Sequence, residues 1–274
     1  MRSYLYVPGN RPSMLAAALT RGADAIIVDL EDAVPPAEKL SARSAVASWL
    51  SAQSPGAAIF VRVNVGAAGL DDARAVVTAA SSALRGLVVA KASLDQLAAL
   101  TTILDELDPT GAVTLVPLLE TPQALLAAAA IASAPRVSRL QIGEADLAAE
   151  LGVTLGEDER ELLFVRSAVV LAAAAAGIDP PAAAVTTDFR DLESLRRTTL
   201  ALRRLGFRGR ACIHPAQIPV VHEVFTPSAQ EVAEARDTID RFEAAGGGVC
   251  LDARGRMVDL AVVRDARRVL AAAP

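Results

Sequence analysis

Short apolar segments alternate with alanine-rich amphipathic segments along most of this chain. The apolar segments are rich in Val, Ile and Leu on both faces, as in Ala-Ile-Ile-Val-Asp-Leu, which is typical of parallel strands buried on both sides. The pattern predicts strands at residues 2–7, 25–30, 58–63, 86–90, 113–118, 139–142, 183–186 and 208–213. It predicts helices between them, for example at 12–20, 38–50, 94–107, 122–134, 158–176, 192–205 and 215–225.

Eight strand–helix units in about 225 residues match the size of a (β/α)8 barrel, the TIM barrel. The sequence therefore predicts an α/β fold with one catalytic barrel domain over residues 1–225. An open doubly wound sheet is the alternative, because periodicity alone does not distinguish the two architectures.

The repeating pattern ends at Phe225. A polar helix is predicted at 228–245, followed by three glycines, a hairpin-like stretch at 249–258 and a final helix that ends at Ala273. We interpret residues 226–274 as a C-terminal helical arm that either packs on the barrel or reaches a neighbouring subunit.

Composition narrows the class of protein. Hydrophobic residues make up 53% of the chain and aromatic residues 3%, so the core is built mainly from Ala, Val and Leu. A net charge of −5 argues against a general nucleic-acid binder. The two cysteines and two histidines lack zinc-type spacing. No dinucleotide, phosphate-loop or serine-hydrolase motif is present, which weighs against those enzyme classes.

We expect a soluble protein of the cytoplasm. The N-terminal apolar residues meet Pro8-Gly9 too early for a signal peptide. The longest apolar run, 168–178, is shorter than the roughly 20 residues that a membrane-spanning helix needs.

Polar side chains follow seven of the eight predicted strands, at the end where barrel enzymes build their active sites. In chain order they are Asp29, Glu31 and Asp32; Arg62 and Asn64; Lys91; Glu120; Glu144 and Asp146; Asp188; and His214. Several carboxylates with little His or Cys point to a hard cation such as Mg²⁺. Arg62 has the planar fork that pairs with a substrate carboxylate. A metal and an arginine in one cavity can hold a 2-keto acid and stabilise an enolate beside its carbonyl.

Structural roles compete with these assignments. Lys91 suits an ion pair, Asp146 suits a helix N-cap, and His214 suits a turn. A glutamate in a buried strand needs a partner, which favours a metal at Glu120. The acids after the second strand are also candidates for helix caps or for partners of barrel arginines; they are Asp29, Glu31 and Asp32.

Several stretches resemble the citrate lyase β-subunit-like group of the HpcH/HpaI aldolase and malyl-CoA lyase superfamily. The resemblance covers nearly the whole chain in order. Its motifs are Leu5-Tyr6-Val7-Pro8-Gly9-Asn10-Arg11-Pro12, Val28-Asp29-Leu30-Glu31-Asp32-Ala33-Val34, Val61-Arg62-Val63-Asn64, Leu118-Leu119-Glu120-Thr121, Gly143-Glu144-Ala145-Asp146-Leu147, Gly206-Phe207-Arg208-Gly209-Arg210-Ala211-Cys212-Ile213-His214-Pro215-Ala216-Gln217 and Gly255-Arg256-Met257-Val258-Asp259.

The resemblance implies a magnesium-dependent lyase (Mn²⁺ being an alternative metal) that cleaves or forms a 3-hydroxyacyl-CoA, such as citramalyl-, malyl- or citryl-CoA. The products are an acyl-CoA and a 2-keto acid. It implies roles for these residues: Glu120 and Asp146 as metal ligands, Arg62 as the clamp on the substrate carboxylate, Gly143 and Glu144 as substrate contacts, Glu31 and Asp32 as groups that orient metal-bound water, and Arg11 and Lys39 as contacts for CoA phosphates. It further implies a homotrimer or hexamer in which the arm caps a neighbouring subunit.

The sequence departs from the family at one point. The family pattern before the metal aspartate is Gly-Ala-Glu-Asp, whereas this chain has Gly143-Glu144-Ala145-Asp146, so the preference for one keto acid over another stays open. The general acid or base is also open among Asp188, Asp191 and Asp259. Two other functions remain: an aldolase for free 2-keto acids, and a citrate lyase β subunit that works only within a complex.

Overall fold

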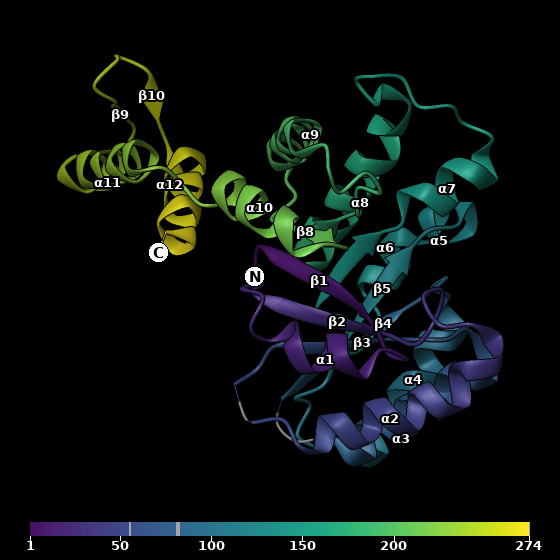
Figure 1. The fold of residues 1–274 in the computed structure, drawn as a ribbon. Coiled ribbons are helices and arrows are strands. Elements are labelled where there is room, and N and C mark those ends of the chain that lie inside the picture. The colour runs from purple at the N-terminus through teal and green to yellow at the C-terminus, as the bar shows by residue number, and fades with distance from the viewer. Residues whose placement is uncertain (55, 81–82, 274) are drawn as a thin grey trace. The chain divides into compact units, whose positions relative to one another are not determined.

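A computed structural model describes residues 1–54, 56–80 and 83–273 of the chain (Figure 1). The chain forms two compact units, Met1–Val221 and the residues from His222 onward. The division falls within helix α10 (Ile218–Phe225), at whose end we predict the domain boundary.

The first unit is a closed barrel of eight parallel strands in chain order. The strands are β1 (Ser3–Pro8), β2 (Ala25–Asp29), β3 (Ile59–Val63), β4 (Leu84–Val89), β5 (Thr114–Leu119), β6 (Arg139–Ile142), β7 (Asp179–Ala183) and β8 (Gly209–Cys212). Parallel pairing of β1 with β8 closes the ring, with Tyr4 opposite Ala211. This confirms the (β/α)8 barrel and excludes the open sheet.

The barrel interior is filled by apolar side chains from several strands. The cluster contains Tyr4, Ala25, Ile27, Phe60, Val88, Val116, Leu118 and Ala182. The rings of Tyr4 and Phe60 meet edge to face with centroids 6.0 Å apart. Because the lumen is packed, a barrel of this kind binds its ligands at the carboxyl ends of the strands rather than inside the ring.

Helices surround the strands of this unit (Figure 1). They are α1 (Pro12–Ala18), α2 (Lys39–Ser51), α3 (Gly66–Ala79), α4 (Leu94–Leu107), α5 (Pro122–Leu126), α6 (Ala128–Ala132), α7 (Glu144–Leu151), α8 (Leu163–Ala176) and α9 (Leu192–Leu205). The predicted helix at 122–134 is two short helices, which meet at Ala127. Helices α3 and α7 are not among the examples named from the sequence, and residues of α7 line the cavity described below.

The seventh strand begins N-terminal to the predicted segment 183–186 and shares only Ala183 with it. Its sequence begins Asp-Pro-Pro, and prolines argue against a central strand because they lack a backbone donor. Here the flanking residues supply the ladder bonds. Asp179 N–H donates to the carbonyl of Ser138 at 3.0 Å, and Arg208 N–H donates to the carbonyl of Pro181 at 3.2 Å.

The second unit contains α11 (Ala229–Ala244), the two-stranded β9 (Cys250–Leu251) and β10 (Met257–Val258), and α12 (Leu260–Ala272). Ser228 and Glu231 form a capping box at the start of α11. Phe242, Val258 and Val263 form its small core. The predicted helix–hairpin–helix order is confirmed.

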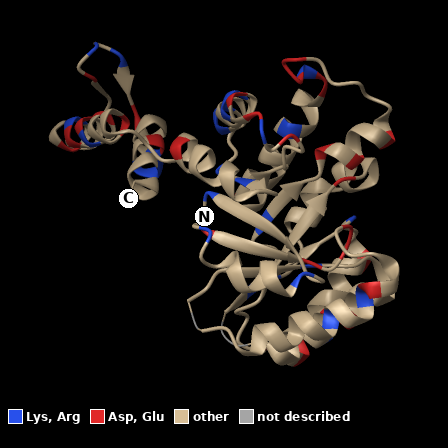
Figure 2. Cartoon of the chain, in the orientation of Figure 1, with Lys and Arg blue, Asp and Glu red and all other residues tan. Residues whose placement is uncertain are grey.

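Charged residues lie mainly on the helices and at strand ends rather than along the strands (Figure 2). Within the described part of the chain, no helix combines the length and hydropathy that crossing a membrane requires.

Candidate active site

A cavity of about 560 Å³ opens at the carboxyl ends of the barrel strands. Its polar wall contains residues from four predicted strand ends, and its other walls are apolar. The lining residues are Tyr6, Val7, Pro8, Met14, Asp29, Asp32, Ala33, Arg62, Leu118, Glu120, Gln141, Ile142, Gly143, Glu144, Ala145, Asp146, Ala184, Val185 and Ile213.

Arg62 enters the cavity from β3 with its guanidinium fixed by Asp29. The register places Asp29 directly opposite Arg62 on the neighbouring strand. Arg62 Nε donates to Asp29 Oδ1 at 2.7 Å and Arg62 Nη2 donates to Oδ2 at 2.6 Å. Burial lowers the pKa of Arg62, but the hydrogen bonds and charge of Asp29 outweigh it and raise that pKa above its usual value.

Two more carboxylates approach the remaining end of this guanidinium. Glu31 Oε2 lies 3.0 Å from Arg62 Nη1, and Asp32 Oδ2 lies 3.4 Å from the same nitrogen. The Asp32 side chain is 59% exposed, whereas that of Glu31 is 8% exposed. The ring of Tyr6 packs against Arg62 with the guanidinium carbon 5.1 Å from its centroid. From the sequence we expect Arg62 to pair with a substrate carboxylate through two of its nitrogens. In the structure, Asp29 already accepts from Nε and Nη2.

Glu120 is almost fully buried in the cavity wall, at 2% exposed. Its Oε1 accepts the backbone N–H of Lys91 at 2.6 Å. On its other side, a Cβ on Gly143 would lie 2.7 Å from Oε2, so only glycine fits there. The pKa of Glu120 is raised to about 7, mainly by burial and also by the charges of Glu31 and Asp146, against the opposing effects of the Lys91 N–H and ammonium.

Asp146 lies in the first turn of α7 and is exposed to the cavity. The N-cap of this helix is Gly143, so the N-cap role that competes for Asp146 is not observed. The structure therefore brings both predicted metal ligands, Glu120 and Asp146, to one cavity.

Glu144 begins α7, and its carboxylate is paired with Arg166 of α8. Arg166 Nε and Nη2 donate to the two Glu144 oxygens at 2.7 and 2.6 Å, and Nη2 also meets Glu159 Oε2 at 2.7 Å. The Glu144 side chain is thus engaged, while the backbone from Gly143 to Asp146 lines the cavity.

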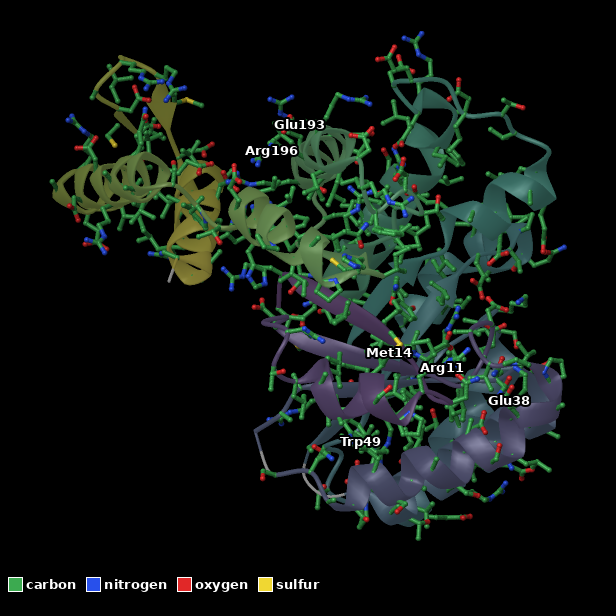
Figure 3. All side chains as sticks on the ribbon, viewed as in Figure 1. Arg11, Met14, Glu38, Trp49, Glu193 and Arg196 are labelled. Atoms are coloured by element: carbon green, nitrogen blue, oxygen red, sulfur yellow. The ribbon has the colours of Figure 1, made fainter. Side chains whose placement is uncertain are left out.

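The prediction that Lys39 binds a CoA phosphate is not supported. Its ammonium donates to the carbonyls of Leu30 and Glu31, at 3.4 and 3.0 Å, and to Asn64 Oδ1. These three acceptors use all three protons of the ammonium. Lys39 therefore stabilises the turn after β2. Arg11 is exposed at the N-cap of α1, the helix that also carries the cavity residue Met14 (Figure 3).

The candidate acids and bases have local partners. Asp191 caps α9 by accepting Ser194 N–H at 2.9 Å. Asp259 caps α12, and Asp188 accepts Arg190 N–H at 3.0 Å. His214 accepts Ala216 N–H at 3.1 Å and stacks on Phe189, as its turn role predicts. None of the four lines the described cavity.

Sequence reasoning named Asp29 only as one of three candidate partners for barrel arginines, without pairing it with Arg62, and it missed Arg166. Asp29 as the fixed partner of Arg62 had a signal, because the last polar residues of two adjacent parallel strands face each other when their registers match. Arg166 had none, since a single arginine in an apolar helix acquires its partners only in the folded chain. Within residues 1–54, 56–80 and 83–273, no three His, Cys, Asp or Glu side chains form a metal-binding group.

Comparison with known proteins identifies the family. The model of the HpcH/HpaI aldolase/citrate lyase family matches residues 2–215. The citrate lyase subunit beta of Leuconostoc mesenteroides subsp. cremoris is 34% identical, over 98% of this chain and 92% of that protein. A (3S)-malyl-CoA thioesterase of Cereibacter sphaeroides is 36% identical, over 99% of this chain and 94% of that protein.

A solved structure has the same fold throughout. The protein CitE of Mycobacterium tuberculosis, in complex with magnesium, acetoacetate and coenzyme A, superimposes with a TM-score of 0.81 and 30% identity, covering 99% of this chain and 97% of that one. The match extends beyond the barrel, so it covers both units. The chain therefore belongs to the HpcH/HpaI aldolase/citrate lyase family and is a lyase similar to citrate lyase β subunits.

Proposed function

We propose that this protein is a magnesium-dependent carbon–carbon lyase that cleaves or forms a 3-hydroxyacyl-CoA. Cleavage breaks the bond between the hydroxyl-bearing carbon and the carbon next to the thioester. The hydroxyl loses its proton and becomes the carbonyl of a 2-keto acid, and the other carbon gains a proton to give an acyl-CoA. Condensation is the reverse.

One observation carries this proposal: a buried carboxylate, Glu120, shares a cavity with Asp146 and with the cation of Arg62. A 2-keto acid has a carboxylate and a neighbouring carbonyl oxygen. An arginine and a cation site on one cavity match these two groups.

The residues present fit a magnesium ion at Glu120 and Asp146. Glu120 Oε1 is used by the Lys91 N–H, and the raised pKa indicates that its buried charge lacks enough compensation from the protein. A divalent cation would supply that compensation. Magnesium commonly takes one or two protein carboxylates and keeps several waters, so a third acidic ligand is not needed. Bound there, the ion would act as a Lewis acid on the keto oxygen.

Arg62 would bind the carboxylate of the keto acid. Since Asp29 holds Nε and Nη2, the guanidinium is already oriented and little side-chain entropy is lost on binding. Asp32 makes the longest contact and is mostly exposed, so it is the group that a substrate carboxylate would displace. The first amides of α7, from Glu144 to Asp146, have no partners within the helix and would donate to the same ligand.

The charges of the cavity favour a keto acid with one carboxylate. Arg62 is the single basic residue among the described residues that line it, whereas five lining residues are acids: Asp29, Asp32, Glu120, Glu144 and Asp146. A second carboxylate would meet these acids or the apolar walls. We therefore expect pyruvate or glyoxylate to bind better than oxaloacetate.

The proposal that the substrate is a coenzyme A thioester is supported by the similar proteins. The similar malyl-CoA thioesterase acts on a CoA thioester by its name, and the Mycobacterium tuberculosis structure contains coenzyme A. Arg11 is an exposed cation three residues before the cavity residue Met14 and is our candidate contact for a phosphate (Figure 3). Glu31 and Asp32 would orient waters on the metal.

Two alternatives use the same site. An aldolase for free 2-keto acids would need the metal and Arg62 but no CoA, and the family description includes aldolases. A β subunit that works only within a citrate lyase complex is favoured by the similarity to the Leuconostoc protein. We further propose a homotrimer or hexamer, with the C-terminal arm contacting a neighbouring subunit, in the cytoplasm.

Calorimetric titration tests the function. Magnesium-dependent binding of pyruvate, followed by binding of acetyl-CoA, is the expected result for the CoA lyase. Pyruvate binding without CoA affinity would favour the free-acid aldolase, and binding of neither would favour the complex subunit. Glu120→Ala and Asp146→Ala should each abolish magnesium-dependent binding, and unchanged binding in both would disprove the metal site.

A further inference from the structure

Lys91 adopts a backbone conformation that L-residues rarely hold. It follows β4 with a φ of 46°, in the left-handed region. This conformation costs a non-glycine residue roughly 1–2 kcal/mol. The backbone N–H of Lys91, at the start of this turn, donates to Glu120 Oε1, 2.6 Å distant.

That hydrogen bond fixes one side of Glu120, and Gly143 closes the other. A Cβ at Gly143 would lie 2.6 Å from the Glu120 Cβ and 2.7 Å from Oε2. The carboxylate is therefore held between two backbone segments, the turn after β4 and the start of α7. Oε1 accepts the Lys91 N–H, and Oε2 lies beside Gly143, which precedes the helix that carries Asp146.

The side chain of Lys91 reaches a different part of the site. Its ammonium lies 3.1 Å from Glu31 Oε1, and the other oxygen of Glu31 lies 3.0 Å from Arg62 Nη1. Lys91 therefore contacts both halves of the proposed site. Its backbone N–H binds Glu120, the proposed metal ligand, and its ammonium binds Glu31, which in turn contacts Arg62. Lys91 does not itself line the cavity.

The choice of lysine is itself informative. The chain has 27 basic residues, of which only Lys39 and Lys91 are lysines. Both ammonium groups bind oxygens of Glu31, Lys39 at the carbonyl and Lys91 at the carboxylate. A compact ammonium fits between closely spaced oxygens where the wide arginine fork does not. An otherwise arginine-rich chain therefore places its two lysines on either side of one glutamate.

We propose that Lys91 is a positioning residue with two separate tasks: its left-handed backbone orients Glu120 for magnesium, and its ammonium holds Glu31 against Arg62. This inference rests on the proposed function, since it presumes that Glu120 binds the metal and Arg62 the keto acid.

Two substitutions separate the tasks. Lys91→Gly and Lys91→Ala both remove the ammonium, so its effects cancel when the two variants are compared. They differ in the backbone, because glycine adopts the left-handed region freely and alanine does not. We expect Lys91→Ala to bind magnesium chloride at least about fivefold more weakly than Lys91→Gly, and to unfold at a lower temperature. Equal affinities would overturn the backbone task.

The role of the Lys91 ammonium is tested by measuring the affinity for pyruvate. At saturating magnesium, Lys91→Gly should bind pyruvate about tenfold more weakly than the unaltered protein while its magnesium affinity is not reduced. Lys91→Arg should not restore pyruvate binding, because the fork does not fit. Pyruvate binding by Lys91→Gly equal to that of the unaltered protein would overturn this task.

The unaltered protein distinguishes failure of the inference from failure of the function. If it binds magnesium and pyruvate and the variants do not differ as described, only the role of Lys91 is wrong. If the unaltered protein binds neither, the proposed function is wrong and the role of Lys91 falls with it.

Discussion

The substitution Glu120→Gln should stabilise the protein when no metal is present. Glu120 is 2% exposed, and burial raises its pKa from 4.5 to about 7. Between pH 4.5 and about 7, the folded protein therefore keeps a proton on Glu120 that the unfolded chain has released. A raised pKa on a carboxyl group means stability that is full below pH 4.5 and is lost as the pH rises through about 7.

The shift sets the size of the effect. Each pKa unit corresponds to about 1.4 kcal/mol, so ionising Glu120 costs the folded state up to about 3 kcal/mol at pH 8. Glutamine has nearly the same shape, can still accept the Lys91 N–H and carries no charge. The metal-free variant should therefore be more stable than the unaltered protein at pH 8, and the difference should shrink toward pH 5.

Magnesium should make the unaltered protein more stable than Glu120→Gln. A ligand at 100 times its Kd adds about 2.7 kcal/mol to the free energy of unfolding of the protein that binds it. The unaltered protein should gain this stability at pH 8, and Glu120→Gln should not. The assay is urea unfolding at pH 5, 6, 7 and 8, in chelator and in excess magnesium.

Asp32→Asn is the matched control, because its side chain is 59% exposed and its removal relieves no buried charge. It should show no comparable gain in chelator. The reasoning is refuted if Glu120→Gln is no more stable than the unaltered protein at pH 8 without metal, or if magnesium stabilises both equally.

Four further outcomes are expected. Arg62→Lys should weaken pyruvate binding at least tenfold in calorimetry without changing magnesium affinity, because a lysine cannot reproduce the fork held by Asp29; weakened magnesium binding would argue against separate roles. With magnesium present, pyruvate should bind at least tenfold more tightly than oxaloacetate, and equal affinities would refute the charge argument. Arg166→Met leaves the Glu144 carboxylate without its partner and should lower the free energy of unfolding by about 3 kcal/mol; a loss below 1 kcal/mol in urea unfolding would count against a buried ion pair. Ser228→Ala removes the cap of α11 and should lower local stability by about 1 kcal/mol, seen as faster hydrogen exchange in that helix alone.

The barrel could be predicted from the sequence because each of its elements is a local pattern. Strands buried on both faces produce apolar runs, and these runs recur with the spacing of strand–helix units. All eight predicted strands overlap those observed, but β7 shares only Ala183 with its predicted segment, because the two prolines near its start mask it. The capping box at Ser228 likewise marks the start of α11 within three residues of sequence.

The composition of the site could also be predicted, since strand order fixes which residues reach the carboxyl ends. That argument brings Arg62, Glu120 and Asp146 to one cavity, as observed. It does not fix which way a side chain points or which neighbour it meets, because those depend on register and on packing between distant segments.

Only the tertiary structure decided which groups the charged side chains of the site contact. Lys39 begins α2 and Lys91 follows β4. The ammonium of Lys39 is enclosed by two carbonyls and an amide oxygen, whereas that of Lys91 contacts the carboxylate of Glu31. Glu144 lies two residues before Asp146, the proposed metal ligand, but an arginine from α8 pairs with its carboxylate. Short-range periodicity sets the elements and their order, whereas the electrostatics of the site depends on charges that are far apart in sequence and meet only once the barrel is closed.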